Sequence, residues 1–447
     1  MRWFTAVLAI LGVAAAGLWW FAARIPASPF DDRPASAAHA TPPEQREYAA
    51  RLADCVACHT TEHGAPFAGG RAMGSPLGTI YTTNITPDDD TGIGAYTLAE
   101  FDNAVRRGVA RDGHRLYPAM PFPSYANLSD ADVEALYDFF MTQVKPVRQD
   151  NRPTTIAWPL NMRWPLAFWS LLFSDDGPYE PSPDRDDAWN RGAYLVQGPG
   201  HCGSCHTPRG FAFQEVAFDE SDTAFLSGAL LDGWYAPSLR NDPNTGLGRW
   251  TENEIIGYLR DGRNRHSVVF GSMLDAFNNS TQFLTDADLH AIAHYLKSLP
   301  GDPDRDGPPW QYDPATAERL SNGTAPEAPG AAIYMAQCSF CHGTDGRGRG
   351  PWIPSLAGAS SLLSSEPASA INLTLNGAGR AVAKGIPDIY RMPALRAKLS
   401  DHEIAEVLTF VRAAWGNTGG PVSAEAVAEL REDTDAASGE VIILQMR

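Results

Sequence analysis

The chain reads CVACH at residues 55–59, CGSCH at residues 202–206 and CSFCH at residues 338–342. All six of its cysteines lie in these three motifs, and a histidine follows each pair directly. At the cysteine and histidine frequencies of this 447-residue chain, chance would supply on the order of 10⁻³ such pentapeptides. The regular spacing, with no cysteine left over, therefore indicates a repeated cofactor motif rather than a disulfide framework.

The spacing suits covalently bound haem. Two thiols three positions apart on one helical turn can each add to a vinyl group of one porphyrin, and the next histidine can then bind the iron from the same side. We therefore expect three haems c. The expected attachment points are Cys55, Cys58, Cys202, Cys205, Cys338 and Cys341, and the expected iron ligands on the same side are His59, His206 and His342.

Zinc and a redox-active dithiol are the alternatives for these motifs. A structural zinc site needs four ligands, but each motif offers three and has no matching second half nearby in the sequence. A thioredoxin-like dithiol belongs in a βαβ unit, and no such pattern is present. Covalent haem is the favoured interpretation.

The sixth ligand decides whether a haem transfers electrons or catalyses a reaction, because a methionine sulfur closes the iron to substrates and raises its potential. Each motif is followed, after one helical segment, by a methionine in a loop. These expected axial ligands are Met120, Met273 and Met392. Methionine also fills protein cores, so other residues compete: Met73, Met141, His63 and His114 in the first repeat, His266 as a bis-histidine ligand in the second, and Met335 in the third.

Each motif belongs to a repeated helical unit. The closing helices are expected to begin with a capping box, in which a Ser or Thr caps the helix and an acid three residues later bonds back to it. These pairs are Ser129 and Asp132, Thr285 and Asp288, and Ser400 and Glu403. A middle helix has the same signal in two units, at Thr97 with Glu100 and Thr251 with Glu254, and is degenerate in the third at residues 371–376. No strand-like alternation of any length is present, so we predict an all-α protein with long loops.

The composition limits the kind of partner and the cellular compartment that the protein can have. The chain has 35 basic and 53 acidic residues, a formal charge of −18, which argues against nucleic acid as a partner. Residues 3–23 form an uncharged run of 21 residues, long enough to cross a bilayer. We interpret this run as a membrane anchor, with a cleaved signal peptide as the alternative, and in both cases the remainder is exported.

A second apolar stretch, residues 156–173, is rich in Trp and Phe but contains two prolines and an arginine. It would make a poor membrane-spanning helix, and its composition suits either a segment at the membrane interface or one buried beneath neighbouring domains. Arg163 and Trp164 are candidate contacts for a quinone. A hydrophobic brace between the repeats is the alternative function of this stretch.

Three further stretches resemble a known family. They read GTIYTTNITPD at residues 78–88, GHRLYPAMPFPSY at residues 113–125 and WPLNMRWPL at residues 158–166. Together with the order of the three motifs, they resemble the cytochrome c subunit of membrane-bound alcohol, aldehyde and gluconate dehydrogenases over about residues 41–430. The resemblance implies electron transfer from a separate catalytic subunit, bearing pyrroloquinoline quinone, molybdopterin or flavin, to ubiquinone or a terminal oxidase. The axial methionines of the family fall on the three already chosen.

We therefore predict three tandem class I cytochrome c domains that act as an electron-transfer subunit, without catalysis of their own, on the periplasmic face of a bacterial inner membrane. The alternatives are a cytochrome subunit of a terminal oxidase complex and a haem peroxidase or reductase. The expected divisions are a membrane anchor or signal sequence at 1–28, domains at 41–150, 185–300 and 329–416, an aromatic segment and linker at 151–184, a linker at 301–328, and a tail at 417–447 with a helix at 424–432 and an apolar end at 441–444.

Overall fold

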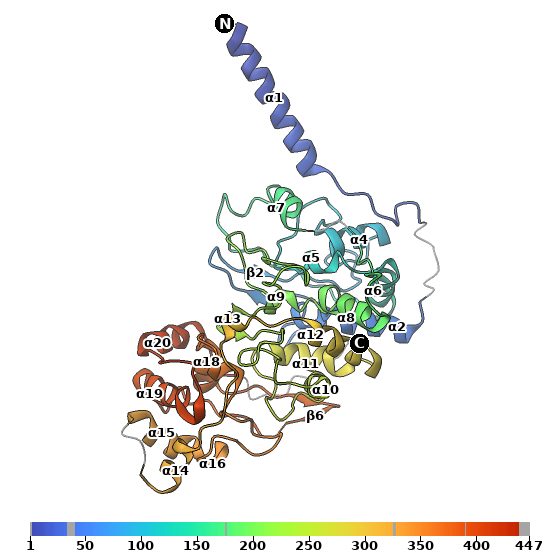
Figure 1. Ribbon diagram of the computed structural model, residues 1–447. Coiled ribbons are helices and arrows are strands. Elements are labelled where there is room, and N and C mark those ends of the chain that lie inside the picture. Colours follow the sequence, from blue (N-terminus) through green and yellow to red (C-terminus); the bar gives the residue numbers. More distant parts are fainter. Residues whose placement is uncertain (1, 34–40, 175–176, 325–327, 389, 438–447) are drawn as a thin grey trace.

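The computed structural model describes residues 2–33, 41–174, 177–324, 328–388 and 390–437. Its helices form three units that follow one another along the chain, and a single helix, α1 (Arg2–Ala23), projects away from them (Figure 1). Unit 1 spans α2 to α6, unit 2 spans α8 to α12, and unit 3 spans α15 to α19. The predicted apolar end at residues 441–444 lies outside the described residues.

Each unit repeats the same order of elements. Unit 1 contains α2 (Pro43–Leu52), α3 (Cys55–Cys58), β1 (Ala72–Met73), β2 (Ile80–Tyr81), α4 (Leu98–Arg107), α5 (Phe122–Tyr125) and α6 (Asp130–Gln143). Unit 2 contains α8 (Asp187–Gln197), α9 (Gly203–His206), β3 (Ala229–Leu231), β4 (Trp234–Ala236), α10 (Glu252–Asp261), α11 (Met273–Asn279), η1 (Thr281–Phe283) and α12 (Asp286–Ser298). Unit 3 contains α15 (Pro329–Gln337), α16 (Ser339–His342), α17 (Ser360–Leu363), α18 (Ala368–Asn376), β5 (Val382–Ala383), β6 (Ile386–Pro387), α19 (Asp401–Val411) and η2 (Ala414–Gly416).

The first helix of each unit packs against the last, in the pairs α2 with α6, α8 with α12 and α15 with α19. In units 2 and 3 a glycine permits the close crossing. A Cβ atom at Gly192 would lie 2.1 Å from the carbonyl oxygen of Ala291, and one at Gly330 would lie 2.1 Å from that of Glu406. Any larger residue would force these helices apart.

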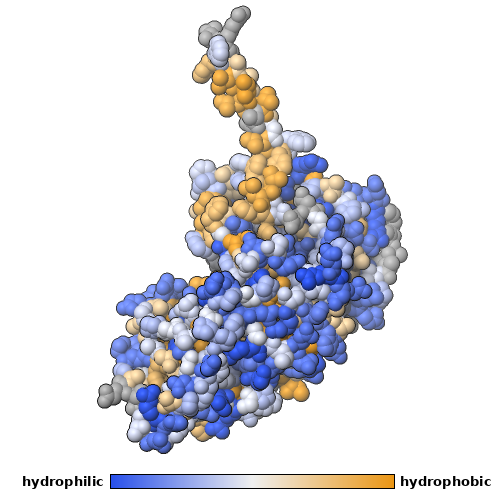
Figure 2. All heavy atoms as spheres, in the orientation of Figure 1, coloured by the Kyte–Doolittle hydropathy of each residue, from blue (hydrophilic) through white to orange (hydrophobic). Residues whose placement is uncertain are grey.

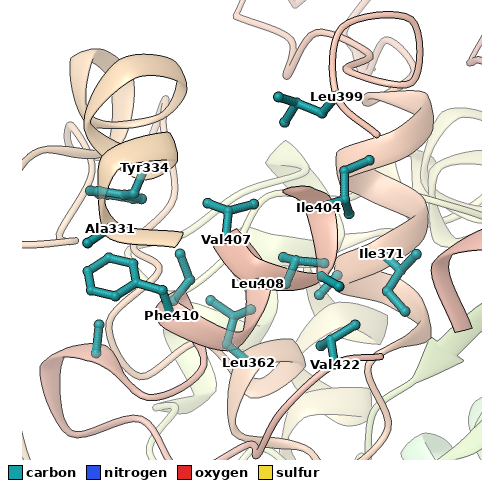
Figure 3. Close-up of a cluster of buried hydrophobic side chains, with 14 of the residues drawn as sticks. Ala331, Tyr334, Leu362, Ile371, Leu399, Ile404, Val407, Leu408, Phe410 and Val422 are labelled. Carbon is teal, nitrogen blue, oxygen red and sulfur yellow. The ribbon is translucent and has the colours of Figure 1, made fainter. Parts of the chain in front are cut away.

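Each unit has its own cluster of buried apolar side chains. Figure 3 shows the cluster of unit 3, in which Tyr334 of α15 faces Phe410 of α19. The tail helix α20 (Ala424–Asp433) completes this cluster with its buried Val427, and Arg431 pairs with Asp401 at 2.7 Å. The predicted tail helix is therefore confirmed, and it packs on unit 3.

The predicted caps form, but two capping boxes are wrong. Thr97, Thr251 and Ser400 each make the reciprocal box with a Glu three residues later. Ser129 and Thr285 accept from the N3 amide, yet the N3 acid is Asp, which is one methylene too short to bond back comfortably. Asp132 and Asp288 instead accept hydrogen bonds from tyrosines of neighbouring units.

Three two-stranded antiparallel ladders, β1–β2, β3–β4 and β5–β6, correct the expectation of a purely all-α protein. Each strand has two or three residues. Alternation of apolar and polar residues cannot be recognised over so few positions. The ladders occupy loops of an otherwise helical protein.

The stretch predicted as a linker at 301–328 is not an exposed connection throughout. It contains α13 (Pro303–Asp306) and α14 (Ala315–Ser321), and Leu320 of α14 belongs to the buried cluster of unit 3. Asp306 accepts hydrogen bonds from the backbone amides of Asn244 and Thr245 in unit 2. The Pro, Gly and Asp residues of this stretch therefore form turns and helix caps rather than an unstructured linker.

An apolar surface lies where α1 meets the body of the protein. α7 (Leu166–Phe173) contacts α1, and Phe21 and Phe168 lie with ring centroids 5.3 Å apart. Figure 2 shows hydrophobic residues along α1 and around this contact. We call this surface the apolar cap and define it by its exposed residues Trp19, Trp20, Trp158, Leu160, Met162, Trp164, Leu171 and Leu172.

Within the described part of the chain, no helix has the combination of length and apolar character that crossing a membrane requires. The membrane-spanning anchor expected at residues 1–28 is therefore not supported. One side of the segment at 156–173 packs against α1 and against Phe122, while the other remains exposed, so the segment is only partly buried.

Candidate haem-binding sites

Each Cys-x-x-Cys-His motif forms a single helical turn directly after the first helix of its unit. These turns are α3, α9 and α16. A turn of helix places the two cysteines of each motif on one side, as attachment to one porphyrin requires. The motif of unit 3 is the most open, since Cys341 is exposed and the Phe340 side chain is 85% exposed.

The three motif histidines are oriented in the same way. Their Nδ1 atoms lie 2.7 Å from the carbonyl oxygen of Thr83 for His59, 2.7 Å from that of Pro237 for His206, and 3.2 Å from that of Pro354 for His342. A carbonyl can only accept, so Nδ1 carries the proton and Nε2 keeps its lone pair. This hydrogen bond fixes the orientation of each imidazole ring and leaves its Nε2 free to bind a metal.

Burial sets the protonation of the motif side chains. Burial lowers the pKa of His59, His206 and His342, against a smaller opposing effect of the hydrogen bond to the carbonyl. The imidazoles are therefore neutral at pH 7, which is the form that binds iron. Burial also raises the pKa of the Cys55 and Cys202 thiols to about 12 and that of Cys58, Cys205 and Cys338 to about 11.

These thiols do not suit a reactive dithiol, which needs a thiolate, because burial disfavours the thiolate here. Among the residues that the structure describes, no group of three or more His, Cys, Asp or Glu side chains could hold a metal ion. The donor set that remains is one neutral imidazole beside two thiols, which fits covalent haem.

The three candidate methionines occupy equivalent positions. In each unit the chain makes an antiparallel bridge after the middle helix, at Val109 with Arg115, Arg263 with Val268, and Val382 with Pro387. The second residue of each bridge lies five positions before the methionine. The same turn therefore leads to Met120, Met273 and Met392, although the sequences of the three turns differ.

Of the competing residues, His114 and His266 lie within these turns, and the others lie outside them. Met141 is on the closing helix α6 and packs on the core of unit 1, and Met73 is in strand β1. His63 is exposed, and His114 pairs with Asp112 at 2.5 Å on the surface. His266 stacks on Trp250, with ring centroids 5.2 Å apart, and Met335 precedes the motif of unit 3 on α15.

The motif of unit 1 lies close to unit 2. The motif turn α3 of unit 1 contacts α11, the helix of unit 2 that begins with Met273. An ion pair between Arg71 and Asp275, 3.0 Å long, joins the same two regions. Met273 also lies at the contact with unit 3, where it packs with Val269, Phe277 and Ala381.

The proposed quinone contacts lie at the edge of the apolar cap. Trp164 is 45% exposed and packs edge-on against Phe168. Arg163 lies over the ring of Tyr117, with its guanidinium carbon 3.5 Å from the ring centroid. Its Nη1 donates to the backbone oxygen of Arg115 at 3.1 Å.

Sequence reasoning missed Arg115 and Tyr117. Both have a buried polar atom, Arg115 Nε and Tyr117 Oη, that has no partner among the described residues. An arginine in a loop ordinarily indicates a solvated surface, so nothing in the sequence marks Arg115 as buried. Its position five residues before a predicted axial methionine is the only signal that could have identified it.

Comparison with known proteins gives a consistent result. The cytochrome c family profile matches residues 190–300 and 327–415, which contain the motifs of units 2 and 3. The chain is 50% identical over 389 residues to the alcohol dehydrogenase (quinone) cytochrome c subunit of Gluconacetobacter polyoxogenes, covering 86% of this chain and 83% of the relative. It is 46% identical to the gluconate 2-dehydrogenase cytochrome c subunit of Pantoea cypripedii, covering 87% and 89%, and 38% identical to the fructose dehydrogenase cytochrome subunit of Gluconobacter japonicus, covering 91% and 85%.

Proposed function

Since the chain belongs to the family of dehydrogenase cytochrome c subunits, we propose that it binds three haems c and passes electrons from a dehydrogenase subunit to ubiquinone or the respiratory chain. Each unit is then a class I cytochrome c domain. The observation that carries the proposal is the equivalent placement, in all three units, of an oriented histidine and of a methionine after the same bridge.

The haems supply reversible one-electron chemistry at iron when they are bound. The residues of this chain hold and tune them. The cysteines would hold each porphyrin, the hydrogen bond at Nδ1 fixes each histidine, and a methionine sulfur as the second iron ligand would exclude substrates. A site with these ligands is suited to electron transfer rather than to peroxidase or reductase chemistry.

The contacts between units support a continuous path for electrons. Unit 2 contacts unit 1 through α3 and α11, and contacts unit 3 through the apolar residues around Met273. The motif turn of unit 1 and the ligand loop of unit 3 therefore both contact α11 or the residues packed around it. Unit 2 is therefore the central member of the path that we propose.

The partner is a separate catalytic subunit that oxidises an alcohol or aldehyde with pyrroloquinoline quinone, molybdopterin or flavin. The open motif of unit 3 favours this unit as the contact with a protein partner. Exposed Phe340 lies beneath Arg349, and exposed Trp352 and Tyr390 pack against each other, in a chain of net charge −18. Aromatic and arginine side chains of this kind are enriched in protein interfaces.

The apolar cap supports a location on the periplasmic face of a bacterial inner membrane. Trp158 and Leu172 are 78% and 71% exposed, and the exposed face of α1 continues the same surface. Soluble proteins rarely expose a contiguous apolar surface of this kind without a partner. We propose that the cap lies in the interfacial region of the bilayer, without spanning it, and that a quinone from the membrane reaches Arg163 and Trp164 there.

The test is purification of the intact complex from membranes. The mass of the denatured chain should include three haems, and the accompanying subunit should be a dehydrogenase whose substrate reduces all three. A ubiquinone analogue should then reoxidise them, and Trp164→Ala with Arg163→Gln should slow this reoxidation without loss of haem. Fewer than three haems, or purification with a copper–haem oxidase in place of a dehydrogenase, would contradict the proposal.

A further inference from the structure

The loop that leads to Met120 contains a buried cation without an anion. Arg115 is 8% exposed, and its Nη2 donates to the backbone oxygen of Arg24 at 2.8 Å. No carboxylate pairs with it among the described residues, and its Nε has no hydrogen-bond partner there. A guanidinium removed from water requires an anion or several acceptors to compensate for its lost hydration.

A second cation adds to this requirement. Arg163 stacks on Tyr117 and donates to the backbone of Arg115, so the two side chains belong to one group. Burial lowers the pKa of both Arg115 and Arg163; no carboxylate offsets that effect, and only Tyr117 opposes it, at Arg163. The hydroxyl of Tyr117, also buried and without a partner, is a third donor in the same group.

The position of this group identifies the anion that it fits. Arg115 lies opposite Val109 at the end of the middle helix α4, five residues before Met120. The group is thus part of the turn that supplies the methionine side of unit 1. A haem held there would bring two propionate carboxylates, and a carboxylate accepts from an arginine and a tyrosine hydroxyl at once.

We propose that Arg115 and Tyr117 bind a propionate of the haem attached to Cys55 and Cys58, and that Arg163 encloses this contact from the side of the apolar cap. This inference rests on the proposed function, because it requires haem in unit 1. Through the backbone of Arg24, the same arginine links the haem site of unit 1 to the end of α1.

The site is specific to unit 1. At the same position of the bridge, unit 2 has Val268 and unit 3 has Pro387, neither of which can bind an anion through its side chain. The two other haems of the chain therefore serve as internal controls. A change at Arg115 should alter one haem of the three.

The expected effect follows from charge. Reduction adds one negative charge to a haem, and a nearby guanidinium stabilises the reduced form. Arg115→Gln should lower the equilibrium constant for reduction of one haem by roughly threefold to tenfold, and a tenfold change corresponds to about 59 mV for a one-electron couple. Tyr117→Phe removes only a hydroxyl and should lower this equilibrium constant less than Arg115→Gln does. Arg115→Lys keeps the charge and should lower it less as well.

The experiment is a spectroelectrochemical titration of the intact complex, with haem content measured by mass. Arg111→Gln is the matched control, because Arg111 is exposed and pairs with Glu100. One lowered potential among three, with Arg111→Gln unchanged, supports the proposal. Where Arg115→Gln fails to retain haem, Tyr117→Phe still provides the test.

Three unchanged potentials in haem-replete Arg115→Gln and Tyr117→Phe proteins would overturn the inference, as would an equal change in all three. Weaker binding of Arg115→Gln to vesicles of phosphatidylglycerol, with unchanged potentials, would also overturn it and indicate a lipid phosphate as the anion. The proposed function fails separately, if the unaltered chain carries fewer than three haems.

Discussion

Unit 2 binds its two neighbours by different chemistry. Towards unit 1 it uses hydrogen bonds between tyrosines and carboxylates. Asp288 accepts from Tyr48 of unit 1 at 2.5 Å while Arg191 holds it from unit 2 at 2.8 Å, and Tyr194 of unit 2 donates to Asp132 of unit 1. Charged acceptors are the stronger partners for such bonds, but they lose that advantage when they are protonated.

Towards unit 3 it uses mostly uncharged groups. Ser369 of unit 3 accepts from the amide of Tyr235 at 2.9 Å and donates to its carbonyl at 3.0 Å. Asn372 donates to the carbonyl of Gly233 at 3.0 Å. A buried ion pair between Arg263 and Asp388, 2.8 Å long, adds charge. The contact of unit 2 with unit 1 should therefore respond to acid and to loss of a single carboxylate. The contact of unit 2 with unit 3 should depend on complementary backbone groups.

The largest expected effect is that of Asp288→Ala. This side chain is 6% exposed, and its loss leaves Tyr48 and Arg191 without their shared acceptor. We expect a loss of about 2–3 kcal/mol in the free energy of unfolding, below the full value for a buried pair because Arg191 is partly solvated. Urea denaturation of the haem-loaded chain measures it, and Asp286→Ala, on the exposed side of the same helix turn, is the control. Equal effects of the two variants would show that Asp288 acts only as a helix residue.

Ser369→Ala should have the next largest effect. It removes two hydrogen bonds to the backbone of Tyr235 and leaves a partly buried amide and carbonyl unpaired, at a cost of about 1–2 kcal/mol. The unfolding of unit 3, followed by the fluorescence of its tryptophans, should shift while the contact of units 1 and 2 is unaffected. Ser365→Ala, on an exposed residue nearby, should cost little. A loss below that of Ser365→Ala would mean that water replaces the missing hydroxyl.

Low pH should weaken the contact of units 1 and 2 more than the contact of units 2 and 3. Burial opposes the ionisation of Asp288, but hydrogen bonds from Arg191 and Tyr48 outweigh it and hold its pKa below the usual value. A depressed carboxylate pKa stabilises the folded state above the unfolded pKa of about 3.9, and this stabilisation is lost as pH falls through the lower folded pKa. Hydrogen exchange should therefore show the contact of units 1 and 2 weakening below about pH 4. Asp288→Asn should remove this step, and a step that persists in the variant would assign it to another carboxylate.

Repeated motifs and short-range features of the fold can be predicted from the sequence. Contacts between segments that are distant in the sequence cannot. The cap at Thr97 and the helix at 424–432 follow from short-range chemistry, and both are present. The capping boxes at Asp132 and Asp288 fail because the acids serve a neighbouring unit, and a contact between distant segments leaves no local pattern. The β ladders are too short to alternate visibly.

The same distinction applies to the candidate site. The cysteines, histidines and methionines are recognisable because their arrangement recurs in each unit. The carbonyls that orient the histidines, at Thr83, Pro237 and Pro354, come from loops of unequal length, 24, 31 and 12 residues away, so no fixed spacing identifies them. Arg115 is recognisable only through its burial, which is a property of the folded chain.

The smallest expected effect concerns the ion pair between Arg71 and Asp275, which joins the motif turn of unit 1 to α11. Both side chains are 44% exposed, so water and salt screen the pair even though its atoms are 3.0 Å apart. A double-mutant cycle with Arg71→Ala and Asp275→Ala should give a coupling of about 0.5 kcal/mol, decreasing further in 1 M salt. The Arg71→Ala change alone should cost more than this coupling, because Arg71 also donates to the carbonyl of Ala57 at 2.5 Å, within the motif turn. A coupling above about 2 kcal/mol that ignores salt would mean that the pair is shielded from water in the haem-loaded protein. The contact of units 1 and 2 would then have a charged centre as well as the tyrosine–carboxylate bonds at its edge.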